Sequence, residues 1–357
     1  MTAWARLALA AAMLLVTRDV AAQIPETGEG MYRAWCAVCH GADGTGRLPT
    51  RPVKTPPLDF SDCRLASPET DADWSLVVSH GGPAAGRSSD MPAFEALSAA
   101  QVRRLVAHLR SFCTERAWPH GNLNLPRALY ATKAFPENEV TLSPIASTGA
   151  TIYPRLSVET TYAARMGPRF EIEVGLPVDT VGWIAGRHNG IGDFSIGGKY
   201  VLYASDSRGL IASAGMDVSL PSGSHTWEFG EGTTVFEPFL ALGQTWRGLF
   251  LQGHIKAILP TYYFPTEPIR RIAYAAGITR PFSTAPDGWA VGVEVDGIDG
   301  SFGLVPQISK GLTKTGALTA TIGVRIPIEP LSPFKSDLTR WTALVVWDFL
   351  EPVRARR

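Results

Sequence analysis

The chain has 357 residues, with 33 basic and 33 acidic side chains and a formal net charge of zero. This balance gives no indication that the protein binds nucleic acid or has an obligate acidic or basic partner. No apolar stretch after the first 22 residues is long enough for a membrane-spanning helix.

Residues 1–22 have the pattern of a cleaved secretory signal. Arg6 makes the n-region basic, an apolar stretch covers 7–16, and small residues at 20–22 form the predicted cleavage site. The mature chain is expected to begin near Gln23. No cysteine stands directly after the cleavage site, so a lipid-anchored N-terminus is not expected, and residues 1–22 contain no twin-arginine pair. The simplest prediction is therefore export to a periplasm by the general pathway.

The most informative motif comprises Cys36 and Cys39, followed at once by His40. Thiols three positions apart on a helical turn share one face, so both can add to the vinyl groups of one porphyrin. His40 is then the proximal iron ligand. A redox dithiol or half of a zinc site is the alternative, but no second Cys/His pair at zinc spacing lies nearby. The motif predicts one covalently bound haem c.

Two further cysteines, Cys63 and Cys113, are left over by this motif. In an oxidising compartment they are expected to form a disulfide. The bond would close a loop of about 50 residues, which the chain-entropy model values at about 4 kcal/mol. The alternative is a pair of buried free thiols.

Met91 is the candidate for the second axial ligand. It lies in a polar turn before a helix in which Ser98 is the predicted N-cap, with Gln101 completing a capping box and an apolar run over 102–109. A thioether ligand raises the reduction potential relative to a second His. His80 is the rival ligand, although the glycine pair after it indicates a helix C-terminus. Met91 could also merely fill a gap in the packing.

Together these pieces make residues 28–113 resemble a class I cytochrome c domain. The matching residues are Gly30, Tyr32, Cys36, Cys39, His40, Gly41, Asp43, Gly44, Thr45, Gly46, Pro56, Pro57, Leu58, Met91, Pro92, Ala93 and Phe94. The resemblance implies three or four helices around one haem, with one ring edge exposed for electron exchange. It also implies that the loop at 56–59 lies near His40 and orients its ring.

The composition changes after the predicted cytochrome c domain, which covers 23–115. Turn-forming and polar residues indicate a linker over 116–137. From 138 to 350 apolar and polar residues alternate with period two, in about twelve segments of about ten residues. The expected fold is therefore multidomain: an N-terminal all-α cytochrome c domain, then an all-β antiparallel barrel of about twelve strands, with a C-terminal tail at 351–357.

Strand number and length are typical of an outer-membrane barrel. Aromatic residues near the segment ends suit interfacial girdles: Trp183, Trp246, Tyr262, Tyr263, Phe264, Phe282, Trp289 and Trp341. A soluble sandwich or lipocalin-like barrel would also alternate, but with its apolar side chains inward. Periodicity alone does not distinguish the two.

In an outer-membrane barrel the polar parity faces the lumen, because charges on the lipid face are costly. This set comprises Arg155, Glu159, Glu171, Glu173, Lys199, Asp217, Glu237, His254, Lys256, Glu294, Asp296, Arg325 and Arg340. Both signs are present, so no simple ion preference follows. Ion pairs that fill the lumen are favoured over a substrate site.

Residues 192–200 and 220–224 resemble a family of outer-membrane channels linked by name to phenol degradation. The last predicted strand, 340–349, resembles an outer-membrane β-signal with its terminal aromatic at Phe349, although further residues follow it. The resemblance implies a barrel in the outer membrane of a Gram-negative bacterium, in contact with lipid, and a possible route for a small solute.

Together these predictions describe an electron carrier rather than an enzyme. A periplasmic cytochrome domain would exchange electrons with a redox partner, and the barrel would tether it to the outer membrane. One alternative is a haem enzyme or gas sensor whose sixth ligand is displaceable. Another is a transporter that its cytochrome domain regulates. The donor, the acceptor and the solute do not follow from the sequence.

Overall fold

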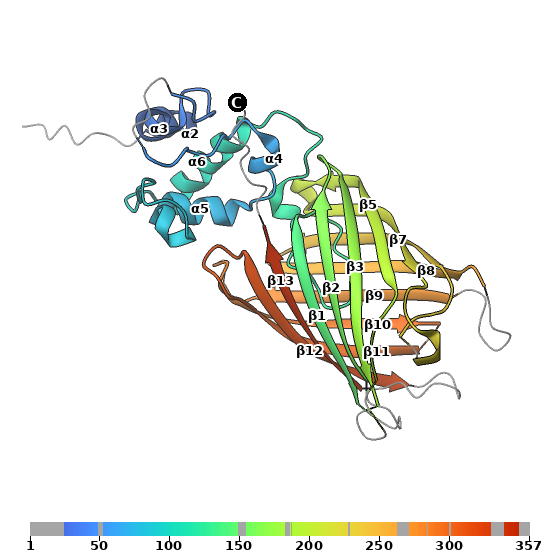
Figure 1. The fold of residues 1–357 in the computed structure, drawn as a ribbon. Coiled ribbons are helices and arrows are strands. Elements are labelled where there is room, and N and C mark those ends of the chain that lie inside the picture. The colour runs from blue at the N-terminus through green and yellow to red at the C-terminus, as the bar shows by residue number, and fades with distance from the viewer. Residues whose placement is uncertain are drawn as a thin grey trace, which may run out of the picture.

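The computed structural model describes residues 25–48, 53–148, 155–182, 186, 188–227, 229–262, 271–283, 285–299, 301–329 and 339–349. A helical domain lies beyond one end of a β-barrel (Figure 1). The predicted signal and the C-terminal tail lie outside the described residues. Within the described ranges, no helix combines the length and the apolar character needed to cross a membrane.

The helical domain is built from short helices around one long one. In chain order they are α2 (Gly28–Met31), the π-helix η1 (Tyr32–Cys36), α3 (Ala37–His40), α4 (Cys63–Ala66), α5 (Asp71–His80), the 3-10 helix η2 (Gly82–Ala85) and α6 (Ala99–Ser111). Ser98 and Gln101 form the predicted capping box at the start of α6. That box satisfies backbone N–H groups that have no partner within the helix.

The core of this domain forms where α2 and η1 meet α6. The predicted apolar face of α6 is buried against Met31 and Tyr32. Gly28 permits the close crossing, because a side chain there would overlap the Arg104 carbonyl of α6. Small and apolar residues at the right spacing therefore bring the cysteine-containing helices onto α6.

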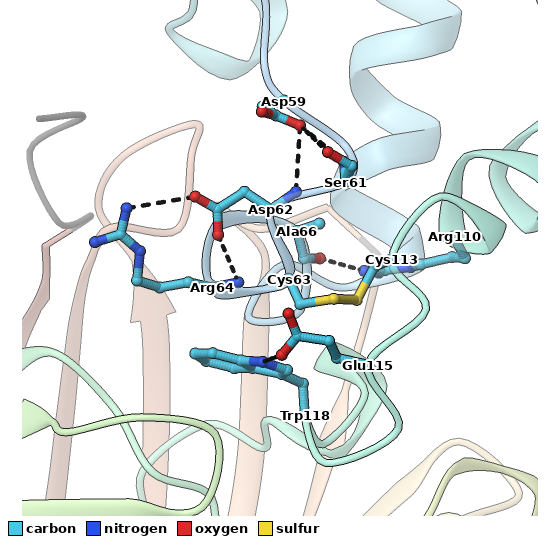
Figure 2. Close-up of a disulfide and its surroundings, with 10 residues drawn as sticks. All are labelled: Asp59, Ser61, Asp62, Cys63, Arg64, Ala66, Arg110, Cys113, Glu115 and Trp118. Atoms are coloured by element: carbon cyan, nitrogen blue, oxygen red, sulfur yellow. Dashed lines mark hydrogen bonds and ion pairs between the residues drawn. A yellow bond between two sulfur atoms is a disulfide. The ribbon is translucent and has the colours of Figure 1, made fainter. Parts of the chain in front are cut away.

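The disulfide between Cys63 and Cys113 is present, as predicted (Figure 2). It joins the first residue of α4 to the segment just after α6, with 5.1 Å between the Cα atoms and a sequence separation of 50. The chain then passes Trp118, whose indole N–H donates to Glu115 at 2.9 Å. The helical domain is thus closed by a covalent bond where the linker begins.

The barrel is a closed antiparallel sheet of twelve strands, β1–β3 and β5–β13, in which β1 pairs with both β2 and β13. All twelve predicted segments are strands. The short extra strand β4, which pairs with the end of β3, was not predicted. The strands are β1 (Glu139–Thr148), β2 (Arg155–Arg165), β3 (Phe170–Val181), β4 (His188–Ile191), β5 (Phe194–Ser205), β6 (Leu210–Leu220), β7 (Val235–Trp246), β8 (Leu249–Pro260), β9 (Arg271–Pro281), β10 (Trp289–Ile298), β11 (Ser301–Gly311), β12 (Leu318–Glu329) and β13 (Thr339–Asp348).

The barrel carries its apolar side chains on the outside. Leu240 is 54% exposed and Leu242 is 55% exposed, and the apolar parity of the other strands is exposed in the same way, for example at Ile322. A soluble barrel turns this parity inward to form its core. The soluble alternative therefore does not describe this barrel.

The polar parity lines the lumen, where charged groups pair as expected. Lys199 lies 2.8 Å from Glu171, and Lys256 lies 3.1 Å from Asp217 and 3.2 Å from Glu237. Further pairs join Arg325 to Asp296 and Arg155 to Asp179. Arg127 of the linker, which was not in the predicted set, pairs with Glu139 and Glu173.

Exposed aromatic side chains mark both ends of the barrel. Trp246 and Trp289 lie at the end that faces the helical domain, and Trp341 and Tyr262 lie at the opposite end. This arrangement agrees with the predicted girdles. Among the predicted residues Trp183, Tyr263 and Phe264 lie outside the described residues.

The segment that the sequence identifies as a linker does not merely bridge the two domains. After the short η3 (Gly121–Leu123), the chain enters the barrel, and most residues from 123 to 137 are buried there. Backbone groups of this segment bond to lumen side chains of β3, β6, β8 and β10. The lumen is therefore occupied by the protein's own chain.

Candidate haem site

The cysteines of the motif lie on one continuous helical stretch. Cys36 is the last residue of η1, and Cys39 and His40 belong to α3. Neither cysteine takes part in a disulfide. Burial raises the pKa of the Cys36 thiol to about 11. Both thiols are thus available for thioether bonds to one porphyrin, as the spacing predicts.

His40 is held in an orientation that suits an iron ligand. Its Nδ1 lies 3.3 Å from the Leu58 carbonyl oxygen, which confirms the expected support from the loop at 56–59. An imidazole that donates from Nδ1 keeps the Nε2 lone pair for a metal. Burial lowers the pKa of His40 below its ordinary value, so the neutral ring is favoured. These residues fit a haem iron.

Aromatic groups fix the backbone around His40. The Phe60 ring stacks on the imidazole with centroids 4.5 Å apart. The Tyr32 hydroxyl donates to the Gly41 carbonyl at 2.6 Å, just beyond the end of α3. The Phe60 N–H donates to the Gly44 carbonyl at 2.8 Å, which ties the loop after the motif to the proximal loop. The imidazole of His40, the predicted proximal ligand, is therefore preorganised by this chain's own contacts.

The loop that carries Met91 is tied down on two sides. The Met91 carbonyl accepts from the Gly82 N–H at 3.0 Å, at the end of α5. The neighbouring Asp90 carboxylate accepts from the backbone N–H groups of Lys54 and Thr55, each at 3.0 Å. Those hydrogen bonds lower the pKa of Asp90, with the Thr55 bond the largest cause. Because Thr55 directly precedes the loop at 56–59, these bonds connect that loop to the loop that carries Met91.

Sequence reasoning did not single out Asp90. Its place one residue before the candidate thioether was the available signal, because a carboxylate there can accept from neighbouring backbone groups. The contacts position the Met91 backbone and do not test its ligation. Met91 therefore stays a prediction as the sixth ligand.

The rival, His80, is the last residue of α5 and is exposed. Gly81 ends the helix with a positive φ of 78°, which agrees with the predicted helix C-terminus. The backbone segments at Gly81 and Met91 lie close together, since a Cβ at Gly81 would be 3.0 Å from the Met91 carbonyl oxygen. The fold thus places both candidate ligands on adjacent segments. Within the described ranges, no group of three or more His, Cys, Asp or Glu residues could hold a different metal.

Comparison with known families supports the helical domain. Residues 23–109 match the family model described as cytochrome C oxidase, cbb3-type, subunit III. The predicted cytochrome c-like domain is thereby confirmed, and such a domain implies haem. No curated protein matches the chain.

Solved structures with a similar fold are outer-membrane barrels. The KdgM porin, at 12% identity, matches 59% of this chain and 99% of its own length with a TM-score of 0.42. An outer membrane channel from Pseudomonas putida F1, at 15% identity, matches 63% of this chain and 100% of its own length with a TM-score of 0.43. The NanC porin, at 10% identity, matches 59% of this chain and 100% of its own length with a TM-score of 0.42. This likeness is one of fold alone.

Proposed function

We propose that the helical domain holds one covalent haem c, ligated by His40 and Met91, and carries electrons between periplasmic partners rather than catalysing a reaction. The observation that carries this proposal is the neutral, oriented imidazole of His40 beside two available thiols. When bound, the haem supplies an iron that changes between ferric and ferrous states. The protein's contribution is to fix the ligands and the surrounding packing, so that little rearrangement accompanies the change.

We further propose that the barrel anchors this domain in an outer membrane. The exposed apolar side chains support contact with lipid, because they would be costly in water. Connections at the helical-domain end are short, for example 166–169 and 247–248, whereas the opposite end has longer ones such as 182–193 and 221–234. Outer-membrane barrels keep short turns in the periplasm and long loops outside. This asymmetry supports a periplasmic helical domain.

Ligand substitution tests the electron-transfer role. Met91→Ala is expected to lower the reduction potential and to change the ferric absorption spectrum, because the thioether is lost. His80→Ala is the matched control, since it removes the rival ligand from the neighbouring segment, and it should leave both unchanged. If His80→Ala changes the potential and Met91→Ala does not, the ligand assignment is wrong.

The same proteins decide between a carrier and an enzyme or gas sensor. A carrier with two firm ligands should not bind carbon monoxide rapidly in the ferrous state, whereas a displaceable sixth ligand permits it. Met91→Ala, with an open position, serves as the positive control. Rapid binding by the unsubstituted protein would favour the enzyme or sensor.

Thiol labelling in whole cells tests the membrane orientation. Ser224→Cys places an exposed thiol in the connection between β6 and β7, and Ala100→Cys places one in α6 of the helical domain. An impermeant maleimide should label the first in intact cells and the second only after the outer membrane is opened. Labelling in the reverse order would overturn the proposed orientation.

A further inference from the structure

The helical domain and the barrel meet through specific contacts that the proposed electron transfer does not require. A flexible tether would be enough to anchor a cytochrome domain, and a linker of turn-forming and polar residues lets a domain move. The contacts at the junction therefore decide whether the helical domain is loosely tethered or docked in one orientation.

The linker is bonded to the helical domain at the start of α5. The Asp71 N–H donates to the Asn122 side chain at 2.9 Å, and the Asn122 amide donates back to the Asp71 carboxylate at 3.1 Å. Gly121 lies so close to the Glu69 carbonyl that a side chain at position 121 would overlap it. Paired hydrogen bonds and close packing therefore fix η3 against α5.

The same stretch of linker is bonded to the rim of the barrel. The guanidinium of Arg165, the last residue of β2, lies 4.6 Å from the centroid of the Trp118 ring. Arg169, in the β2–β3 turn, donates to a linker carbonyl at 3.1 Å. The His120 ring lies 3.5 Å from the Asp206 carboxylate in the β5–β6 turn. Arg165 is only 6% exposed, so its cation–π contact is largely shielded from water and stronger for that reason.

A second contact lies on the opposite side of the rim. Gly86, at the end of η2, has a positive φ of 65°, and a Cβ at this position would lie 3.1 Å from Cγ2 of Thr315 in the β11–β12 turn. Six strands, β6 to β11, separate this turn from the β5–β6 turn in one direction, and the other six separate them in the other. Arg87 pairs with Glu69 at 2.7 Å, which ties η2 to the segment that holds the linker. The helical domain thus bridges the end of the barrel.

This docking turns the haem motif away from the barrel. A cavity of about 1130 Å³ lies between the two domains, and on the helical-domain side residues of 64–73 and 86–87 line it. Among the described residues, those of α2, η1 and α3 take no part in this lining. Figure 1 shows α2 and α3 on the side of the helical domain that is far from the barrel. Val38, which lies between the two motif cysteines, is 64% exposed. The motif therefore faces water.

We propose that the helical domain is docked across the barrel end in this one orientation and does not swing on its linker, so that the face with the haem motif points into the periplasm. The redox partner is then a water-soluble periplasmic protein that comes to this face, and not a protein embedded in the outer membrane beside the barrel. Docking depends only on the contacts between the domains, whereas the nature of the partner rests on the proposed function, which supplies the haem and the side of the membrane.

Pulsed EPR distances test the docking in detergent. With Cys36 and Cys39 in haem attachment and the other two cysteines in the disulfide, Ala100→Cys and Lys314→Cys supply exposed thiols for two nitroxides, one on α6 and one on the β11–β12 turn. A docked domain gives one narrow distance. If the nine linker residues 114–122 moved freely, they would spread this distance over about 15–18 Å.

Substitutions in the linker show which contacts hold the domain. Trp118→Ala, His120→Ala and Asn122→Ala together remove the side-chain contacts of the linker and should broaden the distance distribution. Trp227→Ala is the matched control, because it removes an exposed indole at the opposite end of the barrel, and it should leave the distribution unchanged. A broad distribution in the otherwise unsubstituted protein, or a triple variant that stays as narrow, would overturn the docking.

A disulfide across the second contact tests whether the docked protein exchanges electrons. Gly86→Cys and Thr315→Cys would have their Cβ atoms close enough for a disulfide, so mild oxidation should join them. Gly86→Cys with Ser207→Cys, on the other side of the rim, should stay unjoined. A small soluble c-type cytochrome in its ferrous form then gives one electron to the ferric haem. The locked protein should accept this electron at the rate of the unsubstituted protein.

The outcomes separate the docking from the proposed function. A lock that does not form, or a locked protein that loses electron exchange, would overturn the docked orientation as the one that meets the partner. If the unsubstituted protein itself accepts no electron from the soluble cytochrome, the proposed electron carrier is contradicted, and the soluble partner with it. The EPR distance, which needs no electron exchange, then decides the docking alone.

Discussion

At the residue scale, His120 lies where the helical domain, the linker and the barrel meet. Its ring lies 3.7 Å from the Asp71 carboxylate of α5 and 3.5 Å from the Asp206 carboxylate between β5 and β6. Its Nδ1 also accepts the Asn122 N–H at 3.2 Å, which requires a lone pair on that nitrogen. Burial lowers the pKa of His120, Arg110 lowers it further, and the two carboxylates oppose this. The neutral ring is thus favoured in the folded protein.

This contact predicts a loss of stability in acid. Because folding lowers the pKa of His120 below the ordinary value of about 6.5, the unfolded chain binds the proton first as the pH falls. The stability that the neutral ring contributes is complete above pH of about 6.5 and is lost as the pH falls from there through the folded pKa. The thermal unfolding midpoint should therefore fall less steeply over this range in His120→Gln than in the unsubstituted protein.

The control for that experiment is His225→Gln, which removes an exposed imidazole from the connection between β6 and β7. It should retain the pH dependence of the unsubstituted protein. A flattened profile in the control, or an unchanged profile in His120→Gln, would show that another group titrates.

At the element scale, the disulfide closes the part of the chain that carries α4, α5 and the Met91 loop. It is flanked by Arg110 of α6, whose guanidinium donates to the Ala66 carbonyl and to the Asp71 carboxylate at 2.5 and 2.9 Å. A disulfide and the Arg110 hydrogen bonds therefore join the end of α6 to α4 and α5, which precede the loop that carries Met91.

Loss of this disulfide should destabilise the helical domain. For a sequence separation of 50, the chain-entropy model gives about 4 kcal/mol, and residual structure in the unfolded chain reduces this figure. A Cys63→Ala and Cys113→Ala double variant should lower the denaturant midpoint for the change in haem absorption that accompanies unfolding. Reductant should lower the midpoint of the unsubstituted protein and leave that of the variant unchanged. An equal effect of reductant on both proteins would show that the disulfide is not its target.

The strands could be predicted from the sequence because apolar and polar residues alternate along them with a period of two. All twelve barrel strands follow from alternation, and so does the membership of Glu171 and Lys199 in the polar parity. Alternation is symmetric, however, and does not say which parity faces out. Only the closed barrel, with the apolar side chains exposed, decides that question.

The chain segment at 123–137, which occupies the lumen, could not be predicted in this way. Its bonds to Glu294 use backbone N–H groups, which every residue except proline has, so the residue types at 129–131 do not encode them. The sequence does hold one sign of this segment. Ile211 and Phe239 are apolar at lumen positions, where polar residues are expected, and both pack against the segment. At the haem site the motif itself is local, and for that reason the sequence alone identifies His40 as the candidate ligand.

At the scale of the whole molecule, the barrel and the helical domain differ in what surrounds them. The helical domain buries its apolar residues around α6, whereas the barrel exposes them over its outer face and fills its lumen with charge and with its own chain. The two parts therefore require different solvents on their outer surfaces. A membrane around the barrel, with water at the helical domain, satisfies both.

A charge on the outer face separates this interpretation from a barrel in water. Leu240 lies near the middle of β7 and faces out, and Leu220 is the last residue of β6 at the rim. In lipid vesicles, Leu240→Arg should lower the free energy of unfolding by about 2–4 kcal/mol, because arginine is costly at mid-bilayer, whereas Leu220→Arg should cost about 0–1 kcal/mol. Denaturant titration of the reconstituted protein measures both. Since an exposed leucine in water tolerates either change alike, equal effects at the two positions would contradict a spanning barrel.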